Sequence, residues 1–260
     1  MTDTIRKTLR DSNVARSSAA AVVAFTMLTG YYLTDVIAPL KGLLEGQIGW
    51  TSDDFGTFNS AYGWFNVFLG MLIIGGIILD KMGVRFTGLT AAIVMVAGTM
   101  IKYWAVSTHS LDNQMIFGIK SQVMIAGLGF AIFAVGVEVA GITVSKIIYK
   151  WFKGKELALA MGLEMATARL GTALALSTSV PIAQAFGTIN VARPILVCLI
   201  MLCIGLISFI MYTFMDKKLD ASIAENEAPA EEEFQIKDIL QIITNKGWWY
   251  IAILCVLFYS

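Results

Sequence analysis

Apolar residues gather in six long stretches of the chain, and short segments with charges, glycine or serine separate these stretches. Each stretch is long enough to cross a bilayer as a helix, which takes about 20 mostly apolar residues. A seventh stretch begins near Gly247 and gives only about 20 Å of helix before Ser260. We interpret it as the beginning of a span that continues in a longer protein. The six complete stretches are Ser18–Leu40, Phe55–Leu79, Phe86–Val106, Val123–Lys146, Leu157–Ala183 and Ile195–Met215.

The pattern predicts an all-α membrane protein in four parts. Residues 1–16 form a polar tail, residues 17–215 a six-helix transmembrane domain, and residues 247–260 the start of a second domain. The long polar segment 216–246 lies between the two domains and carries the acidic run Glu231–Glu233. We interpret this segment as a linker, because two parallel repeats of six spans require a long connection after the sixth. A C-terminal six-helix half is then the expected partner.

Composition excludes several classes of protein. Hydrophobic residues make up 57% of the chain and charged residues 15%, whereas soluble domains carry about 25% charged residues. We therefore expect the lipid bilayer to surround the protein. The formal net charge is zero, so no basic surface suggests nucleic acid. The sequence has no metal-site spacing, phosphate loop or nucleophile motif, so we expect no metal, no cofactor and no enzyme.

Lysine and arginine are distributed unevenly between the two sets of loops. Fourteen of the 19 lie in the N-terminal tail and the even loops, whereas the odd loops hold Lys41, Lys102 and Arg193. Cytoplasmic loops carry excess positive charge, so we expect the N-terminus and the even loops in the cytoplasm. The chain has no Asn-x-Ser/Thr sequon, which favours a bacterial inner-membrane protein over a glycosylated eukaryotic one.

The turn after the second stretch combines glycines with charges. Its residues Gly76, Asp80, Lys81, Gly83 and Arg85 resemble the loop motif G-x-L-x-D-R-x-G-x-R of the major facilitator superfamily. An acid at a helix end and bases beyond a glycine turn can pair across a gate. We expect these five residues to act in gating, the alternative being an ordinary basic turn.

A more specific resemblance runs from about Gly30 to Gly171 and concerns the lysosomal dipeptide-transporter branch of this superfamily and its bacterial relatives. The resemblance implies the six-helix N-terminal bundle of a major facilitator fold, followed by the start of a seventh helix. It also implies that the acid Glu138 and the base Arg169 bind the termini of a peptide. The matching segments are Tyr62–Asn66, Gly136–Glu138, Trp151–Leu157 and Met165–Gly171.

Some positions depart from the superfamily pattern. Phe130 stands where many members have an arginine that is linked to proton coupling, and Ala134 stands where a glycine follows. The resemblance therefore does not carry proton coupling over to this chain. The segment Gly171-Thr172-Ala173 lacks the proline that is typical of drug antiporters, which disfavours multidrug export.

Charged residues inside the apolar stretches are candidates for a binding site, because they are costly at membrane depth unless paired or hydrated. Glu138 and Arg169 each lie 15.5 positions from the middle of the turn between Lys153 and Gly154. Antiparallel helices then place both near the midplane of the bilayer, where transporters bind substrate. The two residues can hold the ends of a zwitterion, or they can form a salt bridge that pins two helices.

Other polar residues extend this candidate site. Asp35 is either a cavity acid that binds an amine or a proton, or a helix-end acid near the outer interface. Four residues can line a cavity with aromatic walls and an amide, or can instead serve in packing or at the interface. They are Tyr31, Tyr62, Trp64 and Asn66.

Glu164 has a different expected role. It lies five residues before Arg169, about 140° away around a helix, so it does not share the face of Arg169. We expect Glu164 to pair near the gate with Arg85 or Lys81.

Together these observations predict a solute carrier that works by alternating access, with a dipeptide or another zwitterion as its substrate. An organic anion or sugar-type carrier on the same fold is the first alternative, and Arg169 with Lys120 would then attract an anion. A membrane assembly subunit without transport is an alternative of another class.

Overall fold

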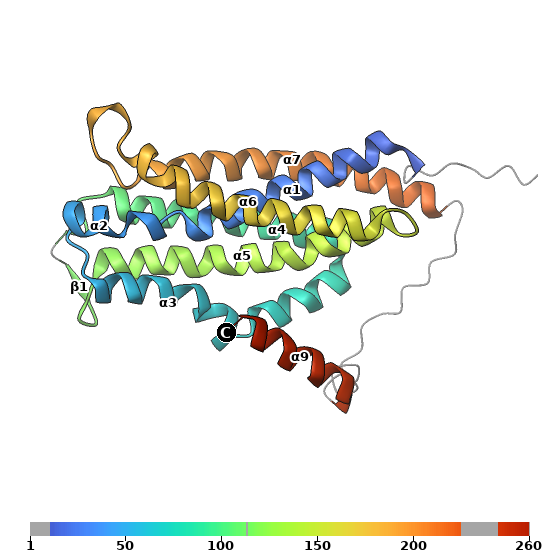
Figure 1. The fold of residues 1–260 in the computed structure, drawn as a ribbon, viewed down its shortest axis with the longest axis horizontal. Helices are drawn as coiled ribbons and strands as arrows, with labels where there is room; N and C mark the ends of the chain where they lie inside the picture. The colour runs from blue at the N-terminus through green and yellow to red at the C-terminus, as the bar shows by residue number, and fades with distance from the viewer. Residues whose placement is uncertain (1–10, 113, 225–243, 260) are drawn as a thin grey trace, which may run out of the picture. The chain divides into compact units, whose positions relative to one another are not determined.

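The computed structural model describes residues 11–112, 114–224 and 244–259, and these residues are almost entirely helical (Figure 1). The prediction of an all-α fold is confirmed, because the strands among the described residues are two short ones that form one hairpin. In order, the elements are α1 (Asn13–Asp35), η2 (Ala38–Leu40), α2 (Lys41–Ile48), α3 (Ser52–Phe68), α4 (Met71–Ser107), β1 (Met115–Ile116), β2 (Ile119–Lys120), α5 (Ser121–Phe152), α6 (Leu157–Ala183), η3 (Ala185–Gly187), α7 (Arg193–Ala224) and α9 (Lys246–Tyr259).

Helices α1 to α7 belong to one compact unit, and α9 belongs to a second unit that is described only by itself. Within the first unit, α4 packs along α5, and α1 packs against α5, α6 and α7. Figure 1 shows these helices running lengthwise beside one another. Glycine allows the backbones of α4 and α5 to approach, since a Cβ at Gly98 would lie 2.4 Å from the backbone nitrogen of Phe133. Such small-residue contacts are common between membrane helices.

Five of the described helical segments are long and apolar enough to cross a membrane. They contain the first, third, fourth, fifth and sixth of the predicted stretches, which agrees with an integral multi-pass protein. The five segments are Asn13–Ile48, Met71–Ser107, Ser121–Phe152, Leu157–Gly187 and Arg193–Ser222.

The second predicted span is not one helix. α3 ends at Phe68, and α4 begins at Met71 after an interruption at Leu69 and Gly70. Gly70 has a φ of 59°, a left-handed conformation that glycine adopts without a steric penalty. The expectation of a continuous helix over Phe55–Leu79 is therefore wrong, because hydropathy does not register this backbone break.

The predicted turn between the second and third stretches is a kink inside α4. Gly83 has a φ of 75° and a ψ of 173°, and helical residues flank it on both sides. A residue with a Cβ is strained at this φ, which gives the second glycine of the motif a local structural reason.

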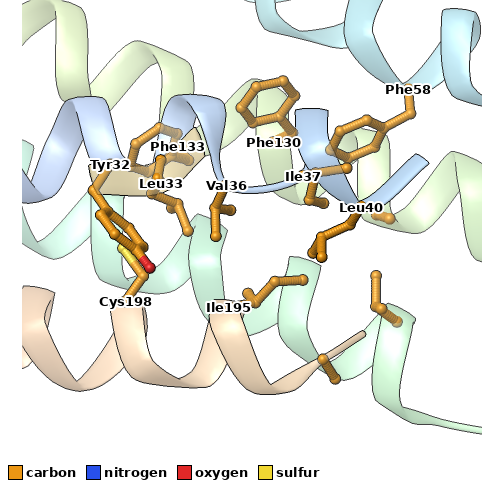
Figure 2. Packing of buried hydrophobic residues seen from close by; sticks show 14 of the residues in the cluster. Tyr32, Leu33, Val36, Ile37, Leu40, Phe58, Phe130, Phe133, Ile195 and Cys198 are labelled. Carbon is orange, nitrogen blue, oxygen red and sulfur yellow. The ribbon is translucent and has the colours of Figure 1, made fainter. Parts of the chain in front are cut away.

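Buried apolar residues of α1, α3, α4, α5, α6 and α7 form a large core, part of which Figure 2 shows. Leu33 of α1 is at most 2% exposed, as are Val36 and Ile37, which follow this helix. Phe58 of α3 stacks on Phe130 of α5, with ring centroids 4.9 Å apart and an angle of 7° between the planes. Phe130, which departs from the superfamily pattern, thus contributes an aromatic ring to the core.

Lys102 is buried next to this aromatic pair and has no exposed surface. Its Nζ donates a hydrogen bond of 3.4 Å to the backbone carbonyl of Leu33. The same ammonium lies 4.3 Å from the ring centre of Phe130 and 5.3 Å from that of Phe58, within range of cation–π attraction. The expectation that Lys102 belongs to an outer loop is therefore wrong, because aromatic faces and a helix-end carbonyl hold its charge inside the bundle.

The two ends of the bundle differ, and we name each after a buried residue. The Trp50 end holds α2, the hairpin β1–β2 and the turn before α7. The Asp216 end holds the kink at Gly83, the turn at Gly154 and the last part of α7. α7 continues to Ala224, beyond the predicted end of the sixth span at Met215. The predicted acidic run Glu231–Glu233 lies outside the described residues.

Candidate functional site

Six polar residues from four helices form what we call the central polar cluster. It includes four of the predicted binding residues on helices α1, α3 and α5, namely Tyr31, Asp35, Tyr62 and Glu138. Arg169 and Thr172 of α6 complete it. The structure therefore gathers residues that lie up to 141 positions apart in the sequence, from Tyr31 to Thr172.

Helix packing brings these residues to the same level of the bundle. Glu138 lies 14 residues before the end of α5, and Arg169 lies 12 residues after the start of α6. These offsets correspond to roughly 21 Å and 18 Å along the two helices. α1 approaches α6 closely at Gly171, where a Cβ would lie 2.3 Å from the carbonyl oxygen of Leu28. A larger residue at this position would separate Tyr31 from Arg169.

The acid of the cluster is held by a tyrosine. The hydroxyl of Tyr62 donates a hydrogen bond of 2.5 Å to Oε1 of Glu138. Asp35 lies close enough to Tyr62 for its negative charge to interact with the hydroxyl of Tyr62. Glu138 is half-buried, so one carboxylate oxygen is fixed while the residue keeps some exposed surface.

The base of the cluster is held differently. The guanidinium carbon of Arg169 lies 5.9 Å from the ring centre of Tyr31, and the residue is exposed on the surface of the bundle. Asp35 accepts a hydrogen bond of 2.7 Å from the hydroxyl of Thr172. Among the ion pairs of the described residues, none joins Glu138 to Arg169. The possible salt bridge between these two residues is therefore not formed in this structure.

Trp64 and Asn66 lie further along α3. The indole of Trp64 donates to the hydroxyl of Ser60 at 3.3 Å, and its ring packs close to Gly127 of α5. The amide nitrogen of Asn66 donates to the carbonyl of Tyr62 at 3.5 Å. The Oδ1 atom of Asn66 is buried and has no hydrogen-bond partner among the described residues. Asn66 therefore keeps an acceptor available, whereas Trp64 is engaged in packing.

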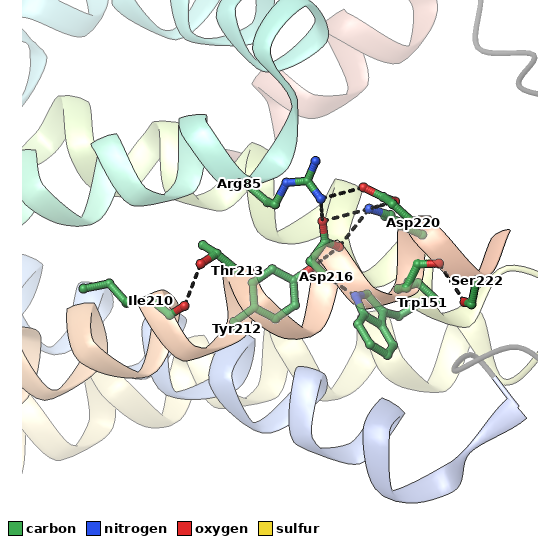
Figure 3. Close-up of polar contacts among 10 residues, drawn as sticks. Arg85, Trp151, Ile210, Tyr212, Thr213, Asp216, Asp220 and Ser222 are labelled. Carbon is green, nitrogen blue, oxygen red and sulfur yellow. Dashed lines mark hydrogen bonds and ion pairs between the residues drawn. The ribbon is translucent and has the colours of Figure 1, made fainter. Parts of the chain in front are cut away.

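A second group of charges lies at the Asp216 end (Figure 3). We call it the Asp216 cluster, and its members are Arg85, Lys150, Tyr212, Asp216 and Asp220. Asp216 has no exposed side-chain surface and binds Lys150 Nζ at 2.8 Å and Arg85 Nη1 at 3.5 Å. Asp220 binds the same two bases at 2.6 and 2.7 Å. The cluster thus ties α4, α5 and α7 together.

The residues predicted to act in gating are divided between this cluster and its surroundings. Arg85 belongs to the cluster, whereas Asp80 forms a separate ion pair of 3.1 Å with Lys146 of α5. Lys81 is exposed and has no ion-pair partner among the described residues. A Cβ at Gly76 would meet open space. Its neighbour Gly75 is the glycine that packs against α5, since a Cβ there would lie 2.5 Å from a methyl carbon of Val139.

The expectation that Glu164 pairs with Arg85 or Lys81 is wrong. Arg85 is taken by the two aspartates of α7, and Glu164 faces a cavity beside α1 and α5.

Lys120, the possible second base of an anion site, lies at the Trp50 end. Its Nζ binds Asp54 at 2.8 Å and also the carbonyl of Gly49. Burial alone would raise the pKa of Asp54, but hydrogen bonds from Lys120 and Thr51 hold this pKa below its usual value. Lys120 therefore serves to join α3 to the start of α5.

Several residues of these two clusters were missed by sequence reasoning. Thr172 carries no charge, so nothing in the sequence connected it with Asp35. Asp216 and Asp220 were assigned to the linker, although their spacing of four residues is the spacing of neighbours on a helix face. Together with the bases at Arg85 and Lys150, this spacing was an available signal for an ionic cluster.

Comparison with known proteins supplies independent information. The sequence model of the family described as Major Facilitator Superfamily matches residues 20–260. The Lysosomal dipeptide transporter MFSD1 of Danio rerio is 24% identical over 251 residues, which cover 91% of this chain and 50% of that protein. The protein of the same name from Homo sapiens is 22% identical over 249 residues, with coverages of 92% and 50%.

A relative named for a different role also matches. The Probable anion transporter 2, chloroplastic, of Oryza sativa subsp. japonica is 28% identical over 159 residues, which cover 61% of this chain and 27% of that protein. The chain therefore spans about half the length of the dipeptide transporters that it matches, and about a quarter of the anion transporter.

Proposed function

The chain belongs to the Major Facilitator Superfamily, and from this premise we propose that it is the N-terminal half of a carrier for dipeptides or similar zwitterions. Membership makes it a membrane transport protein and not an enzyme. The proposed carrier works by alternating access, with its substrate bound between this half and a C-terminal half. Relatives named as dipeptide transporters support the choice of substrate class.

The observation that carries this proposal is the separate engagement of Glu138 and Arg169. Both lie at a similar depth, and each contacts a tyrosine instead of the other. The carboxylate of Glu138 is therefore available to the amino end of a zwitterion, and the guanidinium of Arg169 to its carboxylate end. Arginine suits the second role because its planar fork binds a carboxylate through two parallel hydrogen bonds.

The other residues of the central polar cluster complete the proposed site. Asp35 supplies a second acid for the amino end, oriented by Thr172. Tyr31 and Tyr62 supply ring faces, and Asn66 supplies a hydrogen-bond acceptor that is enclosed in this structure and that a change between access states could expose. We place Trp64 at the edge of the site, where its ring supports α5.

The test is dipeptide uptake into proteoliposomes by the full-length protein and its Glu138→Gln variant. A zwitterion carrier should lose most of its uptake, because the neutral amide cannot balance the charge of an ammonium. Glu45→Gln is the matched control, since Glu45 is an exposed acid of α2 that lies outside the central polar cluster, forms an ion pair with Lys41 and accepts a hydrogen bond from Ser52. Uptake that survives Glu138→Gln unchanged would refute the proposed role of Glu138.

A carrier for organic anions is the second candidate, because one relative is named as a probable anion transporter. Arg169 would then be the main positive site, since Lys120 is held by Asp54 at the Trp50 end. An N-acetylated dipeptide distinguishes the two candidates because it keeps the carboxylate and lacks the ammonium. The zwitterion carrier should reject it, and an anion carrier should accept it.

We further propose that the Asp216 end faces the cytoplasm and contains the gate. Support comes from the excess of lysine and arginine at this end and from the ionic bonds among α4, α5 and α7. A bacterial inner membrane is our proposed location, whereas the dipeptide transporters above carry a lysosomal name. A Lys153→Cys variant without the three native cysteines of this chain, labelled by an impermeant maleimide only after cells are opened, would support this orientation.

A further inference from the structure

A cavity of about 620 Å³ opens beside α1, α5 and α6 at the Asp216 end of the bundle. Most of its wall is apolar and includes Ala20, Ile148 and Leu163. Arg16 and Glu156 line it as charged residues, and Glu164 and Thr167 line it from α6. The Asp216 cluster and the six residues of the central polar cluster contribute nothing to its wall.

Glu164 is the chemically unusual residue of this cavity. Only 4% of its surface is exposed, although it is ionisable and lies within a span. Its backbone carbonyl accepts a hydrogen bond of 2.8 Å from the hydroxyl of Thr167. Within the described part of the chain, no ion pair or hydrogen bond reaches its side-chain carboxylate. The carboxylate nevertheless keeps some contact with the cavity. Glu164 lines the cavity, and its carboxylate oxygens are not among the enclosed polar atoms that lack a partner.

The charged groups on the surrounding helices have other partners. On α1, Arg16 binds Glu156 at 3.7 Å and Asn13 at 2.8 Å, and Asp35 binds Thr172. On α5, Lys146 binds Asp80, and Lys150 binds the two aspartates of α7. On α6, Arg169 lies over Tyr31. No described cation therefore neutralises Glu164 directly.

An ionised carboxylate in this setting is costly, and binding a cation removes the cost. A divalent ion such as Ca²⁺ is usually held by several carboxylates, and the described residues contain no group of three or more acidic, histidine or cysteine ligands. A proton requires only the carboxylate itself. We propose that Glu164 is a proton-binding site that couples transport to a proton gradient. Water in the cavity delivers the proton, and the carboxylate becomes a neutral carboxylic acid.

The position of Glu164 explains how a proton would influence the substrate. Glu164 lies eight residues beyond Glu156 and five before Arg169, or about 12 Å and 7.5 Å along α6. It is therefore located between Glu156, which lines the same cavity, and the base that we assign to the substrate carboxylate. Protonation removes a negative charge near Arg169 and so favours an anionic substrate group there. By thermodynamic linkage, bound substrate then favours the bound proton by the same factor.

This inference rests on the proposed carrier function. Two measurements on the full-length protein test the proton site and the carrier function separately. The first is infrared difference spectroscopy of substrate-free protein during a pH change, which detects the carbonyl band of a protonated carboxylic acid. We expect one such band to disappear in Glu164→Gln and to persist in the control Glu45→Gln. This readout requires no transport, so it tests the proton site even if dipeptides prove not to be substrates.

The second measurement compares dipeptide accumulation driven by a pH gradient with dipeptide counterflow, which needs no gradient. Glu164→Gln should reduce accumulation to the level without a gradient and leave counterflow within about twofold of wild type. Glu164→Asp keeps the acid and should restore accumulation, which serves as a check if the glutamine variant is poorly folded. Gradient-driven accumulation by a folded Glu164→Gln protein, or an unchanged infrared band, would overturn the proposal. A wild-type protein without counterflow would instead refute the carrier function.

Discussion

The hydroxyl of Tyr62 on α3 holds the carboxylate of Glu138 on α5 through a hydrogen bond of 2.5 Å. This contact fixes one oxygen of the acid that we assign to the amino end of the substrate. It also connects the broken second span to the centre of the bundle. The substrate site is therefore expected to depend on a residue that does not itself carry charge.

Replacing Tyr62 with phenylalanine should weaken dipeptide binding by up to about tenfold. The phenyl ring keeps the packing, while the lost bond to a charged group corresponds to roughly 1.5 kcal/mol. Isothermal titration of the purified full-length protein measures the change. Tyr32→Phe is the matched control, because Tyr32 also loses a hydrogen bond, to Thr178 at 2.8 Å, but lies outside the central polar cluster. Equal effects of the two variants would argue against a specific role of Tyr62.

Arg169→Lys should weaken dipeptide binding by about ten- to a hundredfold while the protein still folds. Lysine keeps the positive charge and loses the fork that grips a carboxylate, a loss of about 1.5–3 kcal/mol. Binding is measured on protein with an unchanged melting temperature. If Arg169 is a structural brace, Arg169→Lys should bind normally and Arg169→Ala should mainly lower the melting temperature. That result would leave the dipeptide assignment without its carboxylate partner.

Asp216→Asn should destabilise the protein more than Asp220→Asn. Asp216 has no exposed side-chain surface, so an uncharged side chain there leaves Lys150 and Arg85 with a single acid. We expect a loss of about 2–3 kcal/mol, below the value for a fully buried pair because both bases retain solvent contact. The side chain of Asp220 is 42% exposed, so its loss should cost about 1 kcal/mol or less. Thermal unfolding of the two variants in one detergent decides the order.

Asp80→Asn should slow transport without changing the equilibrium affinity for substrate. The ion pair of Asp80 with Lys146 lies at the Asp216 end and is well exposed, so stability should change by less than about 1 kcal/mol. The expected effect is on the exchange between the two access states. Turnover in proteoliposomes and substrate titration in detergent measure the two quantities separately. A large loss of affinity with normal turnover would place Asp80 in the substrate site instead.

Acid should weaken the junction between Asp54 and Lys120. The pKa of Asp54 lies below its usual value in the folded protein, so this interaction stabilises the fold fully above about pH 4, the pKa of an unfolded aspartate. The stabilisation is then lost as the pH falls through the lower pKa of the folded state. Melting temperatures between about pH 3 and 6 should fall less steeply in Asp54→Asn than in the wild type. Identical slopes would show that the pair contributes nothing.

The fold class followed from the sequence because long apolar stretches have few structural solutions in a membrane. The turn at Gly83 was also predictable, since a motif named the glycine and its charged neighbours. The break at Gly70 was not, because hydropathy reports which environment a segment prefers and carries no information about backbone dihedral angles. The burial of Lys102 was missed for a related reason, since its aromatic partners lie on other helices.

In the candidate site, too, some features could be predicted from the sequence and others depended on tertiary packing. Equal offsets from one turn were enough to predict that Glu138 and Arg169 share a depth, since α5 ends and α6 begins at that turn. Their partners depend on the rotation of each helix about its axis, which tertiary packing decides. Tyr62 reaches Glu138 across 76 positions of the sequence, and Arg85 reaches Asp216 across 131. A single sequence, taken without its relatives, contains no signal for such pairs, so the expected pairing of Glu164 with Arg85 was wrong.

Helix α7 has 32 residues and is therefore about 48 Å long, whereas the hydrocarbon core of a bilayer is roughly 30 Å thick. Its length exceeds that of the core by about 18 Å, so part of a helix aligned with the bilayer normal extends into the layer of lipid headgroups. With the Asp216 end at the proposed cytoplasmic side, we expect lipid phosphates to compete with Asp220 for the exposed face of Arg85, while the buried carboxylate of Asp216 keeps its ion pair with Lys150. The strength of the outer part of this cluster should then depend on the lipid mixture around the protein.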